Sequence, residues 1–441
     1  MKILRFEAIG VYGYLDFNIK FNQDKNFLVG GNGSGKTTAL KLMNALINPS
    51  FRDLLTISFE SCSLIVNDNS NTIIIYANSD GKDIKFGVSS CKNEINLPLQ
   101  SSQETDLFMR KDERLNKLIE GLTRKYITHP VIKEISKLNS PLFLGLDRRT
   151  DLSDTEKEYF HERELWLNAN KKRHDRGRRL VGGALGASLM EIEMLVQNAY
   201  KDIRELEVEQ SHMLRNQILL SSFKYSSFND NSIISDSLSW KQKKGLLMRK
   251  AEIKESVSNI VGLDSSISDE VDDFFDNLGN LLKSLTETNH TAQLEWLLNK
   301  AQIDRMSDIV DIIDIHKSKI DHYYRPINDF LSIVNLFYGD SNKFVDIDAV
   351  GQLSVFRPDY TECTIEGLSS GERQLLIILA HSFFNKNNIF IIDEPELSLH
   401  LKWQENFADI IFSINPNSQF ILATHSPEII AGNKNKAVGC R

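Results

Sequence analysis

The sequence contains few cysteines, and their spacing forms no recognisable pattern. The four lie far apart and include no CxxC pair: Cys62, Cys91, Cys363 and Cys440. Zinc modules and dense disulfide frameworks are therefore not expected, and the reducing cytoplasm is the compartment that fits best.

Long apolar runs are missing as well. No run approaches the ~18 residues that a helix needs to cross a bilayer. Residues 1–9 alternate charged and apolar side chains, whereas a signal peptide has a basic region followed by an apolar one. We therefore expect a cytoplasmic protein that does not enter a membrane.

A strong excess of either charge is also absent. The chain has 52 Lys and Arg against 60 Asp and Glu, a net charge of −8, which excludes a basic coat for nucleic acid but allows a local basic patch. With 41% hydrophobic residues the composition argues against wholesale disorder. The 441 residues exceed the roughly 250 to 300 at which one hydrophobic core stops growing, so two or more folded units are expected.

The sequence pattern changes twice along the chain. Residues 1–150 contain short β-like runs around one clear helix that follows Lys36, and residues 341–441 again alternate short strands with helices. Between them, residues 151–340 have a charged helical pattern. This middle segment is either a separate helical domain or an insertion that splits one nucleotide-binding domain into two lobes.

Apolar residues recur every three or four positions in the middle segment, at Ile192, Leu195, Val196, Ala199, Ile203, Leu206, Met213 and Leu214. This spacing predicts a helix over about 186–220. A return helix, interrupted at Pro326, is expected over about 302–337, and the pair could form an antiparallel arm of coiled-coil type. The heptads are irregular, so packing in a compact helical subdomain is an equal alternative.

The most specific motif is GxxxxGK[ST] at residues 30–37, between an apolar strand and a helix. Its glycines let backbone amides turn toward phosphate oxygens, and the helix N-terminus adds partial positive charge. Lys36 is expected to reach the β- and γ-phosphates of ATP, and Thr37 to bind Mg²⁺. The residues predicted to contact the nucleotide here are Gly30, Asn32, Gly33, Ser34, Gly35, Lys36, Thr37 and Thr38.

Two further motifs suit phosphate chemistry. The apolar strand 390–392 ends in Asp393 and Glu394, which could bind the metal and activate the attacking water in phosphoryl transfer. Alone, this pattern is equally typical of a solvated strand end. Ser369 and Gly371 lie at the start of a helix. The hydroxyl of Ser369 and the free backbone amides of the first turn could bind an anion, although an ordinary helix cap has the same pattern.

Together these motifs resemble those of ABC-type ATPases. Residues 369–372 are similar to the signature motif as spelled in the OLD, Rad50, SMC and RecF branch, residues 393–394 to the Walker B pair, residues 395–400 to the D-loop and His425 to the switch histidine. The resemblance implies an α/β fold, namely an ABC-type P-loop NTPase head with two lobes and a mixed sheet, split by a mainly helical insertion. The lobes would be residues 1–150 and 341–441.

The same resemblance implies how the site works. Two ATP molecules would be held between two heads, so the chain would be a slow ATPase in a homo-oligomer. Lys36 and Thr37 would act in cis, Asp393 would bind the metal, Glu394 the water and His425 the γ-phosphate, whereas Ser369 and Gly371 would act in trans. The family's Q-loop glutamine has no clear counterpart, and Asp147 is the candidate. The resemblance also implies an N-terminal β-hairpin that leads into the phosphate loop. Two aromatic residues of this hairpin, Tyr12 and Tyr14, could stack on adenine or pack internally.

The basic block at residues 171–179 carries six positive charges. It could bind nucleic acid or an acidic protein, or form a solvated linker, because no aromatic residues interleave with it.

Nuclease motifs are missing. Only 16 residues follow His425, so we expect no downstream Toprim domain of the kind that OLD proteins carry, and neither a PD-(D/E)xK nor an HExxH motif replaces it. Residues 393–400 and 424–428 look most like OLD-type ATPases of antiphage systems such as PARIS, with Septu and some retrons next. The first hypothesis is an ATPase sensor and scaffold that answers a phage-encoded trigger and controls a separate effector, such as a Toprim nuclease. A RecF- or Rad50-like DNA-repair ATPase that binds DNA directly is the alternative, and a transporter subunit is third.

Overall fold

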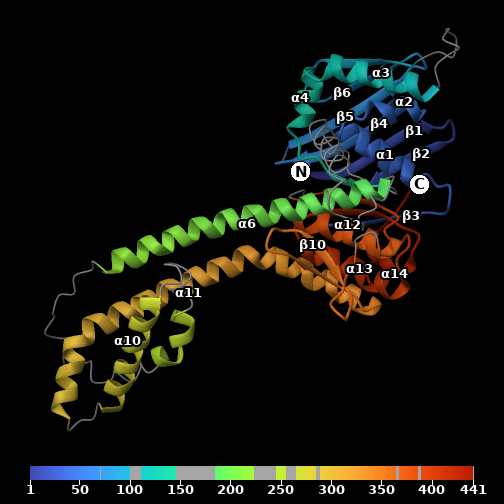
Figure 1. The fold of residues 1–441 in the computed structure, drawn as a ribbon. Coiled ribbons are helices and arrows are strands. Elements are labelled where there is room, and N and C mark those ends of the chain that lie inside the picture. The colour runs from blue at the N-terminus through green and yellow to red at the C-terminus, as the bar shows by residue number, and fades with distance from the viewer. Residues whose placement is uncertain are drawn as a thin grey trace, which may run out of the picture. The chain divides into compact units, whose positions relative to one another are not determined.

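The computed structural model describes residues 1–69, 71–99, 111–145, 184–222, 245–254, 265–284, 289–363, 367–385 and 389–440. The chain forms two compact units, one of Met1–Asn198 with Phe330–Arg441 and one of Ala199–Asp329 (Figure 1). Both boundaries of the second unit fall inside helices. The boundary expected near residue 150 lies outside the described residues and stays a prediction.

The first unit contains a six-stranded antiparallel sheet of order β2-β1-β4-β5-β6-β7. Its strands are β1 (Lys2–Val11), β2 (Leu15–Lys20), β4 (Ser61–Asp68), β5 (Asn71–Ser79), β6 (Asp83–Val88) and β7 (Glu94–Pro98). One face of β2 is buried and the other exposed, which is the period-2 pattern of a half-buried strand. The β1–β2 hairpin leads directly into the strand that carries the phosphate loop.

A second sheet has five strands in the order β14-β3-β13-β12-β8, and all neighbours are parallel. Its strands are β3 (Lys25–Val29), β8 (Leu142–Leu144), β12 (Ile389–Asp393), β13 (Gln419–Ala423) and β14 (Ala437–Gly439). Because both ends of the chain supply strands, the middle segment is an insertion into one head. The head therefore combines parallel and antiparallel strands in separate sheets: the five-stranded parallel sheet, the six-stranded antiparallel sheet and a three-stranded antiparallel sheet within residues 344–363.

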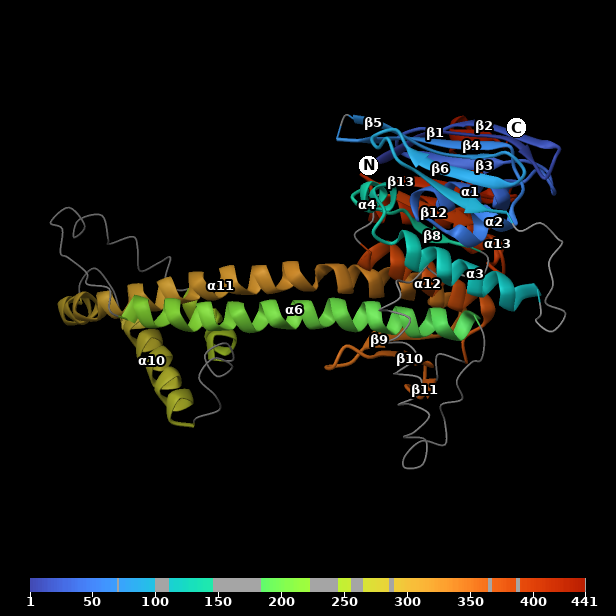
Figure 2. The same cartoon turned by 90° about the horizontal axis from the view of Figure 1, so that it is seen from above.

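The parallel sheet separates two cores. Ile389, Ile391 and Ile421 face the core shared with α1 (Lys36–Ile47) and the antiparallel sheet. Phe390 and Phe420 face the core of α12 (Ser370–Phe384) and α13 (Leu401–Ile414). The layers can be followed in Figure 2. Strands buried on both faces need continuous apolar runs, and every residue of β12 and β13 is buried.

Smaller elements complete the first unit. They are α2 (Phe51–Thr56), α3 (Lys111–Tyr126), α4 (Pro130–Ser136), β9 (Phe344–Ile347), β10 (Leu353–Phe356), β11 (Glu362–Cys363) and α14 (Pro427–Ile430). The short 3₁₀ helices η2 (Gly339–Ser341) and η4 (Lys434–Lys436) join neighbouring elements. α2, α3 and α4 are additional to the one helix that the sequence indicates in its first 150 residues.

The second unit is helical. It contains α10 (Ser265–Ser284) and parts of α6 (Ala184–Ser222) and α11 (His290–Tyr338). Within it, α6 and α11 lie side by side in both views (Figures 1 and 2), and the hydroxyl of Tyr324 donates to Glu207 at 2.8 Å. Phe275 and Trp296 belong to a separate apolar core of this unit. The unit therefore has the packing of a helical subdomain, and a coiled coil stays a prediction.

The expected interruption at Pro326 is wrong, because α11 continues through it. An interior proline costs a helix about 3 kcal/mol. Ile327 and Phe330, which follow the proline in the same helix, are buried, at 3% and 0% exposure, and their packing can offset the cost. Among the described residues, no helix is long and apolar enough to span a bilayer.

Candidate functional site

Lys36 lies where the phosphate loop enters α1. Its side chain is 5% exposed, and its ammonium lies 2.9 Å from the carbonyl oxygen of Gly30 and 2.6 Å from Nε2 of His425. Because a lysine ammonium can only donate hydrogen bonds, Nε2 accepts one, and the neutral ring carries its proton on Nδ1. Two side chains predicted to act on the same phosphate are therefore in direct contact.

The loop before Lys36 leaves backbone amides for an anion. α1 follows Gly35, and in the described part of the chain no side chain caps its first turn. The first amides of a helix have no partner within it, so they can bind phosphate oxygens. Thr37 and Thr38 lie half-buried in this turn, and Asn32 is exposed on the loop.

Asp393 and Glu394 lie at the same edge of the sheet as the phosphate loop. Between β12 and β3 lies β13, and all three strands are parallel, so their carboxyl ends share one edge. Asp393 is fully buried. Glu394 has φ of 46° and donates its N–H to the carbonyl of Ala423 at 2.8 Å. A residue other than glycine in this strained conformation is a common feature of functional sites.

The residues predicted to hold Mg²⁺ carry suitable oxygens but form no complete site alone. Within the described ranges, no three His, Cys, Asp or Glu side chains cluster as a metal site. Mg²⁺ at nucleotide sites takes one or two protein oxygens together with phosphate oxygens and water. The hydroxyl of Thr37 and the carboxylate of Asp393 therefore fit Mg²⁺ that arrives with ATP.

His425 follows β13 and is held from two sides. Its ring contacts Lys36, and its backbone N–H donates to Oε1 of Glu396. The residue before it, Thr424, donates its N–H to the carbonyl of Leu28 at 3.2 Å, which ties this turn to the strand of the phosphate loop. The backbone therefore fixes the position of the histidine.

Ser369 caps α12, which begins at the signature-like motif of residues 369–372 and is called the signature helix below. Its hydroxyl accepts the N–H of Glu372 at 3.3 Å, and the Glu372 carboxylate accepts the N–H of Ser369 at 2.7 Å, a complete capping box. Burial alone would raise the pKa of Glu372, but the hydroxyl of Ser341 and the ammonium of Lys343, 2.9 Å away, hold it below its ordinary value. The helix-cap interpretation is therefore correct as structure. Ser369 is also exposed, so its role in trans stays a prediction.

Gly371 has a structural reason to be glycine. A Cβ at this position would lie 2.2 Å from the backbone carbonyl oxygen of Ser398, a distance that no side chain can accept. The signature helix and the D-loop of the same chain are therefore in close contact. Sequence reasoning assigned Gly371 to a partner's nucleotide and missed this contact.

The remaining expectations have mixed outcomes. Tyr12 and Tyr14 are 47% and 70% exposed, so internal packing does not explain them, and adenine stacking stays a prediction. Asp147 and the basic block at 171–179 lie outside the described residues.

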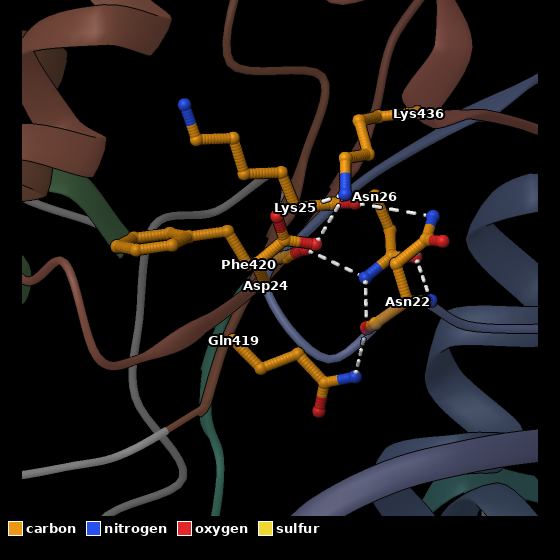
Figure 3. A network of polar contacts seen from close by, with 7 residues as sticks. All are labelled: Asn22, Asp24, Lys25, Asn26, Gln419, Phe420 and Lys436. Atoms are coloured by element: carbon orange, nitrogen blue, oxygen red, sulfur yellow. Dashed lines mark hydrogen bonds and ion pairs between the residues drawn. The ribbon is translucent and has the colours of Figure 1, made fainter.

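No sequence pattern indicates β14, which pairs with the strand of the phosphate loop. Beyond it, the sulfur of Cys440 lies 3.6 Å from the carbonyl oxygen of Ser34. At the other end of β3, Lys436 bonds both carboxylate oxygens of Asp24 at 2.8 Å, beside an amide network of Asn22, Asn26 and Gln419 (Figure 3). Residues directly before and after β14 therefore contact the segments on either side of β3.

A phosphate loop at the carboxyl edge of a parallel sheet, with an acidic strand end and a histidine beside its lysine, defines an ABC-type P-loop ATPase. Its head is split by a helical insertion. The chain belongs to the AAA ATPase domain family (AAA_15), whose model matches residues 1–430. It is accordingly a nucleotide-binding protein that hydrolyses ATP.

One curated relative is described as the retron Vc95 probable ATPase of Vibrio cholerae serotype O1 biovar El Tor. It is 23% identical over 440 residues, which cover 97% of this chain and 71% of the relative. Among solved structures, the Smc head domain with an extended coiled coil bound to the C-terminal domain of ScpA, from Pyrococcus furiosus, has a TM-score of 0.43 at 14% identity, covering 100% of this chain and 94% of that one. The SMC head domain from Thermotoga maritima has a TM-score of 0.39 at 10% identity, covering 99% and 92%.

Proposed function

We propose that this ATPase is the sensor and scaffold subunit of an antiphage defence system, that it oligomerises through its heads, and that it controls a separate effector protein. The observation that carries the proposal is the similarity to a retron ATPase over 97% of the chain. Because the named relative belongs to a retron, a retron-type system is favoured over the other defence systems. A Toprim-type nuclease is the effector we expect, and a phage-encoded factor the trigger.

The proposed roles in hydrolysis follow from chemistry at the sheet edge. Lys36 and the amides of the phosphate loop bind the phosphates, and Thr37 with Asp393 holds Mg²⁺, which supplies positive charge against the phosphate oxygens. Glu394 orients the attacking water as general base. Once its proton has moved from Nδ1 to Nε2 by exchange with solvent, the imidazole of His425 leaves Lys36 and donates a hydrogen bond to the γ-phosphate.

Exposed groups on the head support a two-headed assembly. Ser369 and Ser370 are exposed at the N-terminus of α12, where a helix favours an anion. Leu397, on the D-loop that Gly371 approaches, and Leu401, at the start of α13, are 40% and 60% exposed. Exposed apolar side chains near exposed serine hydroxyls suit a surface that a second head covers when ATP is bound.

Replacing Glu394 with glutamine tests the proposal. We expect Glu394→Gln to bind Mg·ATP as the natural protein does, to lose turnover by roughly 100-fold or more because the general base is gone, and to accumulate as an ATP-bound oligomer. Calorimetry, phosphate release and light scattering measure the three properties.

Glu405→Gln is the matched control, because Glu405 is exposed on α13 and should change none of them. A Glu394→Gln protein that stays monomeric with ATP and hydrolyses it normally would contradict both the assembly and the role of Glu394.

A further inference from the structure

The loop between β12 and α13 contains a carboxylate that no motif role explains. Glu396 accepts the backbone N–H of His425 with Oε1. Its other oxygen, Oε2, is shielded from solvent and accepts no hydrogen bond from the described residues. A buried carboxylate oxygen that accepts no hydrogen bond is unfavourable. The side chain is therefore held in this orientation by its other contacts, such as the hydrogen bond between Oε1 and the N–H of His425.

The loop itself is strained and held in place. Two residues that are not glycine have positive φ, Glu394 at 46° and Ser398 at 62°. Two backbone hydrogen bonds close the turn, from Leu397 to Glu394 at 3.2 Å and from Leu399 to Glu396 at 3.0 Å. Such strain persists only where surrounding contacts fix the conformation, and it is common at functional sites. The loop is therefore rigid.

Each end of this rigid loop contacts a different part of the ATPase site. At one end Glu396 holds the backbone of His425, whose ring contacts Lys36. At the other end the carbonyl of Ser398 lies so close to Gly371 that a Cβ there would be 2.2 Å away. A shift of the histidine when its ring leaves Lys36 for a phosphate would thus be passed through Glu396 to the signature helix of the same chain.

We propose that Glu396 is a positioning residue for His425, and that it couples the occupancy of the phosphate site to the position of the signature helix. The inference rests on the proposed contact between His425 and the γ-phosphate. Glu396 itself touches neither ATP nor water in this assignment. It should therefore affect turnover more than nucleotide affinity.

Three variants test the role of Glu396. Glu396→Ala removes the acceptor, and we expect kcat to fall on the order of tenfold or more, the usual effect of losing a partner that orients a functional histidine, with KM for ATP within about threefold. Glu396→Gln keeps an acceptor oxygen and should retain at least half of the activity. Glu405→Ala, on the neighbouring helix, should behave as the natural protein.

A double variant separates positioning from general damage. If Glu396 acts through His425, the protein with both His425→Ala and Glu396→Ala should be no slower than His425→Ala alone. Multiplied losses in the double variant, or full activity of Glu396→Ala, would overturn the proposal. If His425→Ala itself keeps full turnover, the proposed role of the histidine fails first, which is a different result. Thermal unfolding of each variant identifies any loss caused by misfolding.

Discussion

At the scale of single residues, the phosphate loop is glycine-rich for two independent reasons. Gly33 and Gly35 have φ of 78° and 87°, which other residues rarely adopt. Gly35 also packs beneath the hairpin, because a Cβ there would lie 2.7 Å from Cζ of Phe17. The first reason can be predicted from the motif, since the motif implies the turn. The second cannot, because it depends on where another strand places its ring.

Comparison of two glycines separates these reasons. Gly81 has φ of 85° and open space where a Cβ would be, so Gly81→Ala should lose only the cost of a left-handed alanine, about 1 to 2 kcal/mol. Gly35→Ala adds the clash with Phe17 and should lose more stability and bind Mg·ATP more weakly. Thermal unfolding and calorimetry measure both effects. Equal losses of stability in the two variants would contradict the importance of the hairpin contact.

At the scale of elements, whether a strand or helix can be predicted from the sequence depends on its burial and its length. The strands at 389–393 and 419–423 are recognisable because strands buried on both faces need continuous apolar runs, and the helix after Lys36 because the phosphate loop specifies it. β14 has three residues, too few to establish a pattern, and exists because β3 offers it an open edge. The contact between Glu396 and His425 joins two loops, which local patterns do not relate.

The packing of α6 against α12 makes a prediction about pH. Burial lowers the pKa of His381 on α12 to about 4, although Glu191 on α6 lies 3.7 Å from its Nε2. At 3.7 Å the carboxylate is too far away for a hydrogen bond, so burial determines the direction of the pKa shift. The amide of Asn385 lies 2.8 Å from Nδ1, which suits a neutral ring. The unfolded chain therefore binds a proton that the folded chain refuses between about pH 6.5 and 4.

Stability should accordingly fall as the pH drops through that window, by on the order of 3 kcal/mol from this residue. His381→Gln should be less stable than the natural protein at pH 7 but lose less on going from pH 7 to pH 5. The midpoint of thermal unfolding at the two pH values measures this. His212→Gln, at an exposed position, should keep the natural pH dependence, and an unchanged dependence in His381→Gln would refute the assignment.

At the scale of the whole molecule, the order of motifs predicts the head but not its limits. Lys36 and Asp393 lie far apart in sequence, and their shared chemistry predicts that they meet in one sheet, as β3 and β12 do. The division into two units after residues 198 and 329 falls inside continuous helices. Neither composition nor periodicity changes there, so the sequence offers no signal for it.

This division implies that nucleotide binding needs the first unit alone. Every described residue predicted to contact ATP belongs to it, and its core includes Val196 on α6 and Phe330 on α11, next to the two points where the second unit joins. We expect a chain in which a flexible linker of about ten residues replaces residues 199–329 to bind Mg·ATP with natural affinity in calorimetry. The same shortened chain with Lys36→Met should show no binding heat. Loss of binding in a shortened chain that remains folded by circular dichroism would mean that the helical unit takes part in the nucleotide site.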